Sequence, residues 1–382
     1  MIRAAEFVEA AREAGFADYA GVPCSFLTPF INYVISDGQL RYISSANEGD
    51  AVATAAGAAI AGRRACAMMQ NSGLGNAVSP LTSLTNVFGI PILLIITQRG
   101  APGVQDEPQH RTMGEITGAL LDLMQIKWEA FPAESDRIAP ALQRATTYMR
   151  DDSLPYAFVM QKDTVAPHPL ADAVAIPSRR QVRCLYQDAD DDDITLDRRS
   201  VLQTVIEHTP EDDCIVIATT GYAGRELFAC RDRSNQFYMV GSMGCASSLG
   251  LGLALARPDL RVVIIDGDGA ALMRMGNIAT LGSYGPDNLL HLLLDNGVHD
   301  STGAQATVSS NINFAAIARA SGYGMATSGT GLATVQQLFT AEKINGPRFA
   351  HLKIKPGTIP DLPRPDVSPQ QVLRRMQKHF GF

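Results

Sequence analysis

The sequence predicts an α/β protein built from two doubly wound parallel-sheet domains. Short apolar runs alternate with helical stretches, which indicates parallel strands joined by right-handed crossovers. This rhythm occurs twice along the 382 residues, and a proline-containing, acidic segment separates the two halves. We therefore expect a first domain over residues 1–168, a linker over 169–197 and a second domain over 198–382.

In the first half, several runs are apolar throughout, which is typical of strands that are covered on both faces. The expected strands are Tyr19–Val22, Leu40–Ser44, Ala65–Met69, Ile90–Thr97 and Tyr156–Met160. Stretches of small residues between them predict helices at Ala51–Ala61 and Val78–Val87.

The second half repeats the pattern with longer apolar runs. The expected strands are Cys214–Ala218, Phe237–Val240, Val262–Ile265, Leu289–Leu294 and Phe349–Ile354. The expected helices are Ser200–Glu207, Cys245–Ala256, Ala271–Leu281 and Phe314–Ala320.

Composition excludes several classes of function. The net charge of −7 and the lack of a basic stripe argue against a nucleic-acid partner. No run reaches the ~18 apolar residues of a membrane span, and acidic residues stand where a signal peptide needs an apolar core. Six cysteines without paired spacing predict free thiols in a reducing cytoplasm rather than disulfides or a zinc site. The acidic run 188–193 is interpreted as a solvated part of the linker and not as a metal site.

Open α/β sheets bind ligands beyond the carboxyl ends of their strands. Three glycine-containing segments of the second half follow predicted strands there: 218–221, 241–244 and 267–270. Glycines let backbone N–H groups approach a phosphate, and a helix N-terminus favours its negative charge. One such turn is weak by itself, but three together favour a phosphate-binding edge. The expected contacts are Thr219, Thr220, Gly241, Ser242, Gly267, Asp268, Gly269 and Ala270.

Two of the predicted strands each end in an oxygen-bearing side chain. Gly267-Asp268-Gly269 follows one strand, and Asp295-Asn296 comes 25 residues later, after the next. Mg²⁺ prefers near-octahedral oxygen ligands at ~2.1 Å and often keeps phosphates among them. Asp268, Asn296 and a backbone carbonyl near Val298 supply such ligands. Each residue alone is as readily a helix cap or a turn residue, but their joint spacing favours a Mg²⁺–diphosphate site and points to a thiamine diphosphate enzyme.

The spacing of these two segments resembles the thiamine diphosphate motif, although Asp295 stands where that motif usually has asparagine. The whole chain resembles the phosphonopyruvate decarboxylase family and the related sulfopyruvate decarboxylases. This resemblance implies a pyrimidine-binding domain followed by a diphosphate-binding domain, with no middle domain. The segments that carry it are Gly21-Val22-Pro23-Cys24-Ser25, Asn47-Glu48-Gly49-Asp50-Ala51, Met69-Gln70-Asn71-Ser72-Gly73, Gly241-Ser242-Met243-Gly244 and residues 295–303.

The resemblance implies roles for residues of both halves. Glu48, which follows a predicted strand, would hydrogen-bond the pyrimidine N1′ of the cofactor and activate it. Met243 would support the bent form of the cofactor. The two half-sites would come from different subunits, so the smallest active unit would be a homodimer or a higher homo-oligomer. Gln70, Asn71 and Ser72 are expected to line the cofactor cleft.

The implied reaction is that of a carbon–carbon lyase acting on a 2-oxo acid. It is the decarboxylation of 3-phosphonopyruvate to phosphonoacetaldehyde and CO₂. Two alternatives stay open: decarboxylation of sulfopyruvate to sulfoacetaldehyde, and carboligation or decarboxylation of another 2-oxo acid. His110 is a candidate for proton transfer. The candidate substrate contacts are Ser25, Arg99, His110, Arg111 and Thr302.

Two hypotheses from other classes are less consistent with the sequence. A dinucleotide-binding module needs a Gly-x-Gly-x-x-Gly turn after its first strand, where this chain has Val22-Pro23-Cys24-Ser25. A non-catalytic subunit is expected to have lost Glu48 or Asp268, and both are present.

Overall fold

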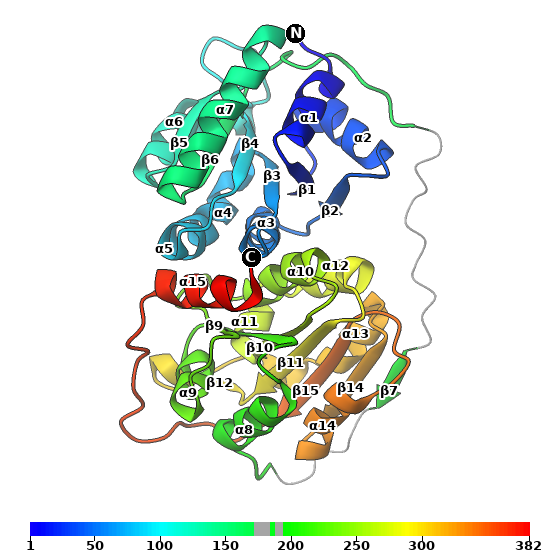
Figure 1. The fold of residues 1–382 in the computed structure, drawn as a ribbon, viewed down its shortest axis with the longest axis vertical. Coiled ribbons are helices and arrows are strands. Elements are labelled where there is room, and N and C mark those ends of the chain that lie inside the picture. The colour runs from blue at the N-terminus through cyan, green and yellow to red at the C-terminus, as the bar shows by residue number, and fades with distance from the viewer. Residues whose placement is uncertain (172–183, 188–193) are drawn as a thin grey trace. The chain divides into compact units, whose positions relative to one another are not determined.

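The computed structural model describes residues 1–171, 184–187 and 194–382. The chain divides into two compact units, Met1–Ser178 and Arg179–Phe382 (Figure 1). Much of the expected linker, including the acidic run 188–193, lies outside the described residues, so the predicted bounds of the domains and linker stay a prediction. No helix in the described part of the chain is both long and apolar enough to cross a membrane.

The first unit contains a parallel sheet with the strand order β2-β1-β3-β4-β6-β5. All five predicted strands are confirmed, with small shifts at their ends. β5 was not predicted, because this edge strand is only partly buried and has no continuous apolar run. The strands are β1 (Phe16–Gly21), β2 (Arg41–Ser44), β3 (Arg64–Gln70), β4 (Leu93–Thr97), β5 (Lys127–Ala130) and β6 (Tyr156–Met160).

Helices cover both faces of this sheet (Figure 1). On one face, Phe7, Phe30, Phe131 and Phe158 form a buried aromatic cluster. The almost fully buried Ala-rich helix α3 packs against β1 and β3, because its small residues allow close approach. The helices are α1 (Ala4–Glu13), α2 (Thr28–Ser36), α3 (Glu48–Ile60), α4 (Leu74–Pro80), α5 (Asn86–Phe88), α6 (Arg111–Leu123) and α7 (Ser135–Asp152).

The helix expected over Val78–Val87 is present, but it is not a regular α-helix throughout. α4 ends at Pro80, a π-helical segment covers Leu81–Thr85, and α5 follows. Proline lacks a backbone N–H and its ring crowds the preceding turn, so the regular hydrogen-bond ladder cannot run through it.

The second unit contains a seven-stranded parallel sheet with the order β7-β14-β15-β11-β10-β8-β9. All five predicted strands are confirmed within a few residues, whereas β7 and β14 were not predicted. The central strands β10 and β11 are apolar and buried along almost their whole length. The strands are β7 (Leu185–Gln187), β8 (Cys214–Ala218), β9 (Gln236–Tyr238), β10 (Arg261–Gly267), β11 (Leu289–Asp295), β14 (Met325–Gly329) and β15 (Arg348–Lys353).

The prediction of a single helix over Ala271–Leu281 is wrong. The chain leaves the helical conformation at Arg274, whose side chain packs on Gly244 so closely that a Cβ there would lie 2.5 Å from the Arg274 Cγ. The other expected helices of this unit are confirmed. The helices are α8 (Arg198–His208), α9 (Tyr222–Cys230), α10 (Ala246–Ala256), α11 (Asp268–Met273), α12 (Gly276–Tyr284), α13 (Phe314–Ser321), α14 (Leu332–Thr340) and α15 (Pro369–Phe380).

In each sheet, the connections on the two sides of one strand pair run in opposite directions. In the first unit this pair is β1 and β3, and in the second it is β8 and β10. Doubly wound sheets bind ligands in the crevice that opens at the carboxyl ends of such strands. The segments singled out by the sequence follow these strands or their neighbours in both units.

Candidate active site

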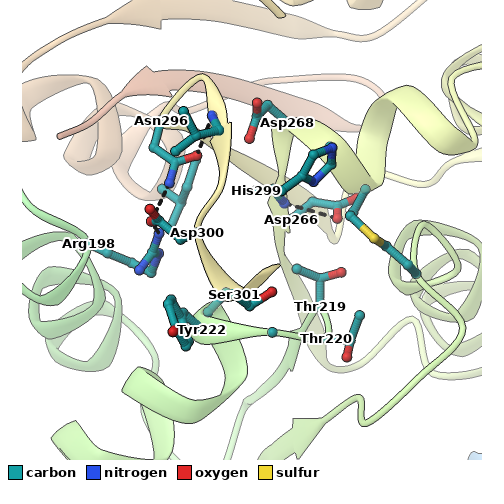
Figure 2. Close-up of a pocket in the computed structure, with 18 residues that line it drawn as sticks. Arg198, Thr219, Thr220, Tyr222, Asp266, Asp268, Asn296, His299, Asp300 and Ser301 are labelled. Atoms are coloured by element: carbon teal, nitrogen blue, oxygen red, sulfur yellow. Dashed lines mark hydrogen bonds and ion pairs between the residues drawn. The ribbon is translucent and has the colours of Figure 1, made fainter. Parts of the chain in front are cut away.

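A pocket in the second unit lies at the carboxyl ends of β8, β10 and β11 (Figure 2). β10 and β11 are parallel neighbours, with Gly267 opposite Leu294, so Asp268 and Asn296 leave the sheet at the same edge. The expected convergence of these two residues is confirmed. The predicted residues that line the pocket are Thr219, Thr220, Met243, Gly267, Asp268, Gly269, Ala270, Asn296 and Val298.

Asp268 is a buried carboxylate, with 3% of the residue exposed. Burial raises its pKa above the usual range, because a desolvated carboxylate resists ionisation, and a hydrogen bond from Thr307 opposes the rise only in part. The Thr307 hydroxyl donates to Asp268 Oδ2 at 2.5 Å. A cation at this position would relieve the cost of the buried negative charge.

Asp295, which occupies the place of the usual asparagine, is directed into the protein. Its carboxylate contacts His351 Nε2 at 2.9 Å and accepts a hydrogen bond from Ser309 Oγ at 2.7 Å. Burial alone would raise the Asp295 pKa, but the hydrogen bonds from His351 and Ser309 outweigh it and lower the pKa overall. Thr307 Oγ1 lies 3.1 Å from Ser309 Oγ and so connects this carboxylate to the one on β10.

Asn296 has a partner at each end of its amide. Its Nδ2 donates to Asp300 Oδ2 at 2.5 Å, and its Oδ1 accepts a longer hydrogen bond, 3.3 Å, from the backbone N–H of Val298. Val298 begins the short strand β12 (Val298–His299), which forms a hairpin with β13 (Gln305–Ala306). This hairpin keeps the segment after Asn296 at the pocket.

The pocket has the polar groups and the space that a diphosphate requires. Thr219 Oγ1 is buried and has no hydrogen-bond partner among the described residues. Gly221 has a φ of +97°, which favours glycine, and it precedes the N-terminus of α9 at the pocket wall. At Gly267 an added Cβ would meet nothing within 4 Å, so the backbone there faces open space.

The available cation ligands fit a metal ion that is shared with a bound diphosphate better than a metal ion held by protein groups alone. Within the described residues, no group of three or more His, Cys, Asp and Glu side chains is placed to hold a metal ion. One carboxylate, one amide oxygen and one backbone carbonyl are hard ligands, and they leave coordination positions for phosphate oxygens.

Two side chains lie over Gly269. A Cβ at this position would be 2.4 Å from His299 Cε1 and 3.2 Å from Met243 Cε, so a larger residue would displace His299. Gly241 and Ser242 precede Met243 and are not among the described residues that line this pocket. Their contact with the cofactor stays a prediction.

In the first unit, Glu48 begins α3 after the N-cap residue Asn47, whose side chain accepts from Gly49 N. The half-buried Glu48 carboxylate accepts a hydrogen bond of 2.8 Å from Asn76 Nδ2. It also lies directly over Gly73, where a Cβ would be 2.1 Å from Glu48 Oε1. The position of this carboxylate therefore depends on glycine at 73.

At the end of β3, the structure places Asn71 differently from its neighbours Gln70 and Ser72. Gln70 Nε2 donates to Ser72 Oγ at 2.5 Å, and both residues lie at the carboxyl edge. Asn71 is fully buried; its Nδ2 donates to the Arg99 carbonyl at 2.9 Å and its Oδ1 accepts from the Arg99 N–H at 3.2 Å. Asn71 therefore supports the turn at Arg99, and its direct contact with the cofactor stays a prediction that this burial disfavours.

Two of the predicted substrate residues, Ser25 and Arg99, lie together. Arg99 Nη1 donates to Ser25 Oγ at 2.9 Å, while Nε and Nη2 contact the two carboxylate oxygens of Asp106. The guanidinium also lies 4.7 Å from the centre of the Phe26 ring. The hydrogen bond from Arg99 holds the pKa of Asp106 well below its usual range.

The other substrate candidates are separate from this pair. The Arg111 side chain is 83% exposed and forms an ion pair with Glu115. His110 is buried, and its Nδ1 has no hydrogen-bond partner among the described residues. Thr302 is exposed, and its hydroxyl donates to the carbonyl of His299 and to Gln305.

Several residues around the second-unit pocket were not found from the sequence. Arg198 lines it, and Thr307, Ser309 and His351 hold its carboxylates. These residues come from scattered elements with no recognisable spacing, so only the fold reveals that they meet. Asp300 lies in the segment 295–303 that the sequence singled out, but its contact with Arg198 was not predicted.

Comparison with known proteins divides the chain in the same way. Residues 3–123 match the "Thiamine pyrophosphate enzyme, N-terminal TPP binding domain", and residues 220–352 match the corresponding "C-terminal TPP binding domain". A phosphonopyruvate decarboxylase from Streptomyces viridochromogenes is 44% identical over 378 residues, which cover 99% of this chain and 94% of the relative. The chain belongs to the phosphonopyruvate decarboxylase family.

More distant similarities agree with membership of the phosphonopyruvate decarboxylase family. A sulfopyruvate decarboxylase from Methanosarcina acetivorans is 28% identical, and the alignment covers 97% of this chain and 96% of the relative. The solved 4-hydroxybenzoylformate decarboxylase of Rhodococcus jostii, described as thiamine diphosphate-dependent, has a TM-score of 0.71 at 14% identity. It covers 94% of this chain and all of its own, and it shows the fold alone.

As a member of the phosphonopyruvate decarboxylase family, this chain is a decarboxylase that uses thiamine diphosphate. It carries the two cofactor-binding domains without a middle domain, as expected. Apart from Arg198 and Thr219, the residues that line the pocket of the second unit lie within the matched C-terminal domain, and Glu48 lies within the matched N-terminal domain.

Proposed function

We propose that the protein catalyses the Mg²⁺-assisted decarboxylation of 3-phosphonopyruvate to phosphonoacetaldehyde and CO₂. The observation that carries this proposal is the 44% identity to a phosphonopyruvate decarboxylase over 99% of the chain. The reaction breaks the bond between C1 and C2 of the oxo acid, and a proton replaces the lost carboxylate. Thiamine diphosphate, when bound, supplies an electron sink for the carbanion that CO₂ leaves behind.

The residues of the second unit would hold the diphosphate end of the cofactor. Asp268, Asn296 and the Val298 carbonyl would bind Mg²⁺. The buried Thr219 hydroxyl and the backbone at Gly267 would face the phosphate oxygens. This assignment gives the desolvated Asp268 carboxylate and the unpartnered hydroxyl their missing partners.

Glu48 of the first unit would exchange a proton with the pyrimidine N1′. Support comes from the way its carboxylate is held, between the Asn76 amide and the backbone of Gly73. A carboxylate fixed in this manner keeps its geometry without any contribution from the cofactor.

The anionic tail of the substrate would bind at Arg99 and Ser25. Asp106 fixes the orientation of the Arg99 fork, and Nη1 together with the exposed Ser25 hydroxyl forms the edge that is available to a ligand. The high exposure of the Arg111 side chain makes it the weaker of the two arginine candidates. His110 would handle the proton that replaces CO₂, because its Nδ1 is buried and unpartnered among the described residues.

A paired substitution tests the substrate and the residue together. The parent, Arg99→Lys and Arg111→Lys would be assayed with phosphonopyruvate, sulfopyruvate and pyruvate by following aldehyde formation. We expect the parent to prefer phosphonopyruvate. We expect Arg99→Lys to raise the KM for the phosphonate about tenfold, with little change for pyruvate, because lysine cannot keep the two contacts with Asp106 and also offer a donor at the Ser25 edge.

Arg111→Lys is the matched control, and it should leave all three substrates within about twofold of the parent, as surface substitutions usually do. A preference of the parent for sulfopyruvate would favour the second candidate reaction, which the near full-length sulfopyruvate decarboxylase relative supports. Equal effects of the two substitutions would remove Arg99 from the substrate site.

We also propose a cytoplasmic homodimer or higher homo-oligomer with its sites between subunits. All six cysteines are free thiols, which suits a reducing compartment. The two proposed half-sites belong to different compact units, each at the carboxyl edge of its own sheet. This separation supports assembly of a site from two domains.

A further inference from the structure

The Asn296 amide has two ends of almost equal shape and opposite chemistry. Its oxygen can bind a hard cation, whereas its NH₂ group only donates hydrogen bonds and cannot bind one. The end that faces the pocket therefore decides whether this residue can bind Mg²⁺. Nothing in the spacing of the motif determines that choice.

An acceptor on the other side of the amide determines it. Asp300 begins the 3₁₀ turn Asp300–Thr302, and its Oδ2 lies 2.5 Å from Asn296 Nδ2. A carboxylate only accepts hydrogen bonds, so it takes the NH₂ end and leaves the oxygen on the opposite side. Figure 2 shows that oxygen on the side of Asp268.

Asp300 is in turn held by a buried ion cluster, formed by Arg198, Glu226 and Asp300. Arg198 Nη2 donates to Asp300 Oδ2 at 2.8 Å, and Nη1 donates to Glu226 Oε1 at 2.7 Å. The three side chains are only 3–8% exposed. The backbone N–H of Gly357 adds contacts of 3.1 Å to both Asp300 oxygens. The carboxylate therefore cannot rotate without losing several partners in a region of low dielectric.

We propose that Asp300 is a positioning residue that keeps the Asn296 oxygen turned towards the metal, and that Arg198 keeps Asp300 in place. The inference rests on the proposed role of Asn296 as a Mg²⁺ ligand. A purely structural role, in which Arg198 joins α8 to α9, accounts for the Arg198–Glu226 pair. It does not account for the contact between Asp300 and Asn296, which is shorter than the contacts of Arg198 with Glu226 and with Asp300.

The Asp300→Leu variant tests the orientation by removing the acceptor with little change in size. Asp300 Oδ2 accepts from both Arg198 and Asn296. Leucine offers neither of them an acceptor, so the Asn296 amide loses the contact that keeps its oxygen turned towards the metal. We expect the affinity for Mg²⁺, in the presence of saturating thiamine diphosphate, to fall roughly tenfold to a hundredfold, the usual effect of losing an outer-shell partner. Calorimetric titration of Mg²⁺, or titration of Mn²⁺ followed by electron paramagnetic resonance, measures this without substrate.

Glu226→Gln is the matched control for charge. It removes one negative charge from the same arginine and does not touch Asn296. If orientation is what matters, it should weaken Mg²⁺ binding by no more than about threefold, because the hydrogen bond that orients the Asn296 amide is left in place. Equal losses in the two variants would overturn the proposal, because charge or cluster integrity would then explain both.

The Asp300→Asn variant provides a rescue. Its amide oxygen can take the place of Oδ2 and accept from both Arg198 and Asn296, while its net charge is that of Asp300→Leu. We expect Mg²⁺ affinity to return to within about threefold of the parent level, because the partner that orients Asn296 is kept. A folded Asp300→Asn variant that binds Mg²⁺ as weakly as Asp300→Leu would overturn the proposal.

Asp300→Ala removes the same acceptor, and it takes the place of Asp300→Leu if that variant proves poorly folded, which circular dichroism and thermal melting would reveal. Failure of the parent itself to bind Mg²⁺ with thiamine diphosphate is a separate result. It would remove the proposed metal site, and with it this inference, before any variant is compared.

Discussion

Asp268 and Asp295 are buried carboxylates at the ends of neighbouring strands, yet their surroundings shift their pKa values in opposite directions. Burial raises the pKa of Asp268, and the single hydroxyl of Thr307 does not compensate. Burial acts on Asp295 too, but hydrogen bonds from His351 and Ser309 outweigh it and lower its pKa. Among the described residues, the first carboxylate is held by a hydroxyl, whereas the second is held by a hydroxyl and an imidazole.

These shifts predict opposite effects of two isosteric substitutions on the cofactor-free protein. The raised pKa of Asp268 adds stability at pH values below the ordinary aspartate range, and this stability is lost as pH rises through the raised pKa. Asp268→Asn should therefore stabilise the protein at neutral pH by on the order of 1 kcal/mol, with a smaller gain in acid. It should at the same time abolish Mg²⁺ binding.

The lowered pKa of Asp295 has the opposite effect on how stability depends on pH. Its contribution to stability is present above the ordinary aspartate range and is lost as pH falls through the lowered pKa. Asp295→Asn should destabilise at neutral pH by about 1–3 kcal/mol, because a charge-assisted hydrogen bond with His351 is lost. Urea unfolding of parent and variants at several pH values, without metal or cofactor, measures both effects. Changes of the same sign would contradict the assignment.

At the scale of elements, the start of α3 packs against the segment before α4, and the contact is possible only because residue 73 is glycine. The Glu48 carboxylate occupies the space that a side chain at residue 73 would need. Gly73→Ala should therefore push Glu48 out of position and lower kcat about a hundredfold, which is the scale expected for a misplacement of about 1 Å. Circular dichroism should show an intact fold, because the collision is with one side chain.

Gly75→Ala, two residues further along, is the matched control. A Cβ at Gly75 would meet nothing within 4 Å in this chain. Alanine there should add roughly 0.5–1 kcal/mol of stability, since glycine is the poorer helix former, and kcat should stay near the parent value. Equal loss of activity in both variants would show that the sensitivity lies in the backbone of α4 and not in the contact with Glu48.

The elements that the sequence predicted well are those whose burial is uniform. β8 is apolar throughout, β10 and β11 are apolar along most of their length, and all three appear within two residues of the expected bounds. The missed strands β5 and β7 are edge strands with partly exposed residues, so no apolar run marks them. The third missed strand, β14, is mostly buried, but its sequence Met-Ala-Thr-Ser-Gly contains no apolar run either. The broken helix at Arg274 was missed because its cause is a contact with Gly244, thirty residues away in the sequence.

The same distinction applies to the site. Asp268 and Asn296 could be found because both follow predictable strands, and the parallel sheet places such strand ends side by side. The contacts that hold these residues in place could not be found in this way. Arg198 and Asp300 are 102 residues apart, and their ion pair follows from tertiary packing that leaves no local pattern.

At the scale of the molecule, each unit has its own sheet, and the proposed pyrimidine and diphosphate half-sites belong to different units. A mixing experiment tests whether one site uses two chains. Glu48→Gln and Asp268→Asn should each be inactive alone. If sites form between subunits of a twofold dimer, differently tagged copies expressed together should regain roughly a quarter of the parent activity, because random pairing restores one site in each mixed dimer.

Each variant expressed with a tagged copy of itself is the control and should stay inactive. If every chain completes its own site, the mixed sample should show no gain over these controls. Purification through both tags in succession would isolate the mixed dimers and should double the specific activity of the mixture, because half of all randomly formed dimers are mixed.

The pairing of Arg99 with Asp106 also affects how the protein meets its substrate. The molecule carries a net charge of −7, and the arginine proposed to bind the anionic tail is already neutralised by its neighbour. Such a site exerts little attraction at a distance, so diffusion must bring a multiply charged anion to it against a weak general repulsion. Capture then depends on short-range fit at the Arg99–Ser25 edge, and added salt should speed the encounter slightly by screening that repulsion.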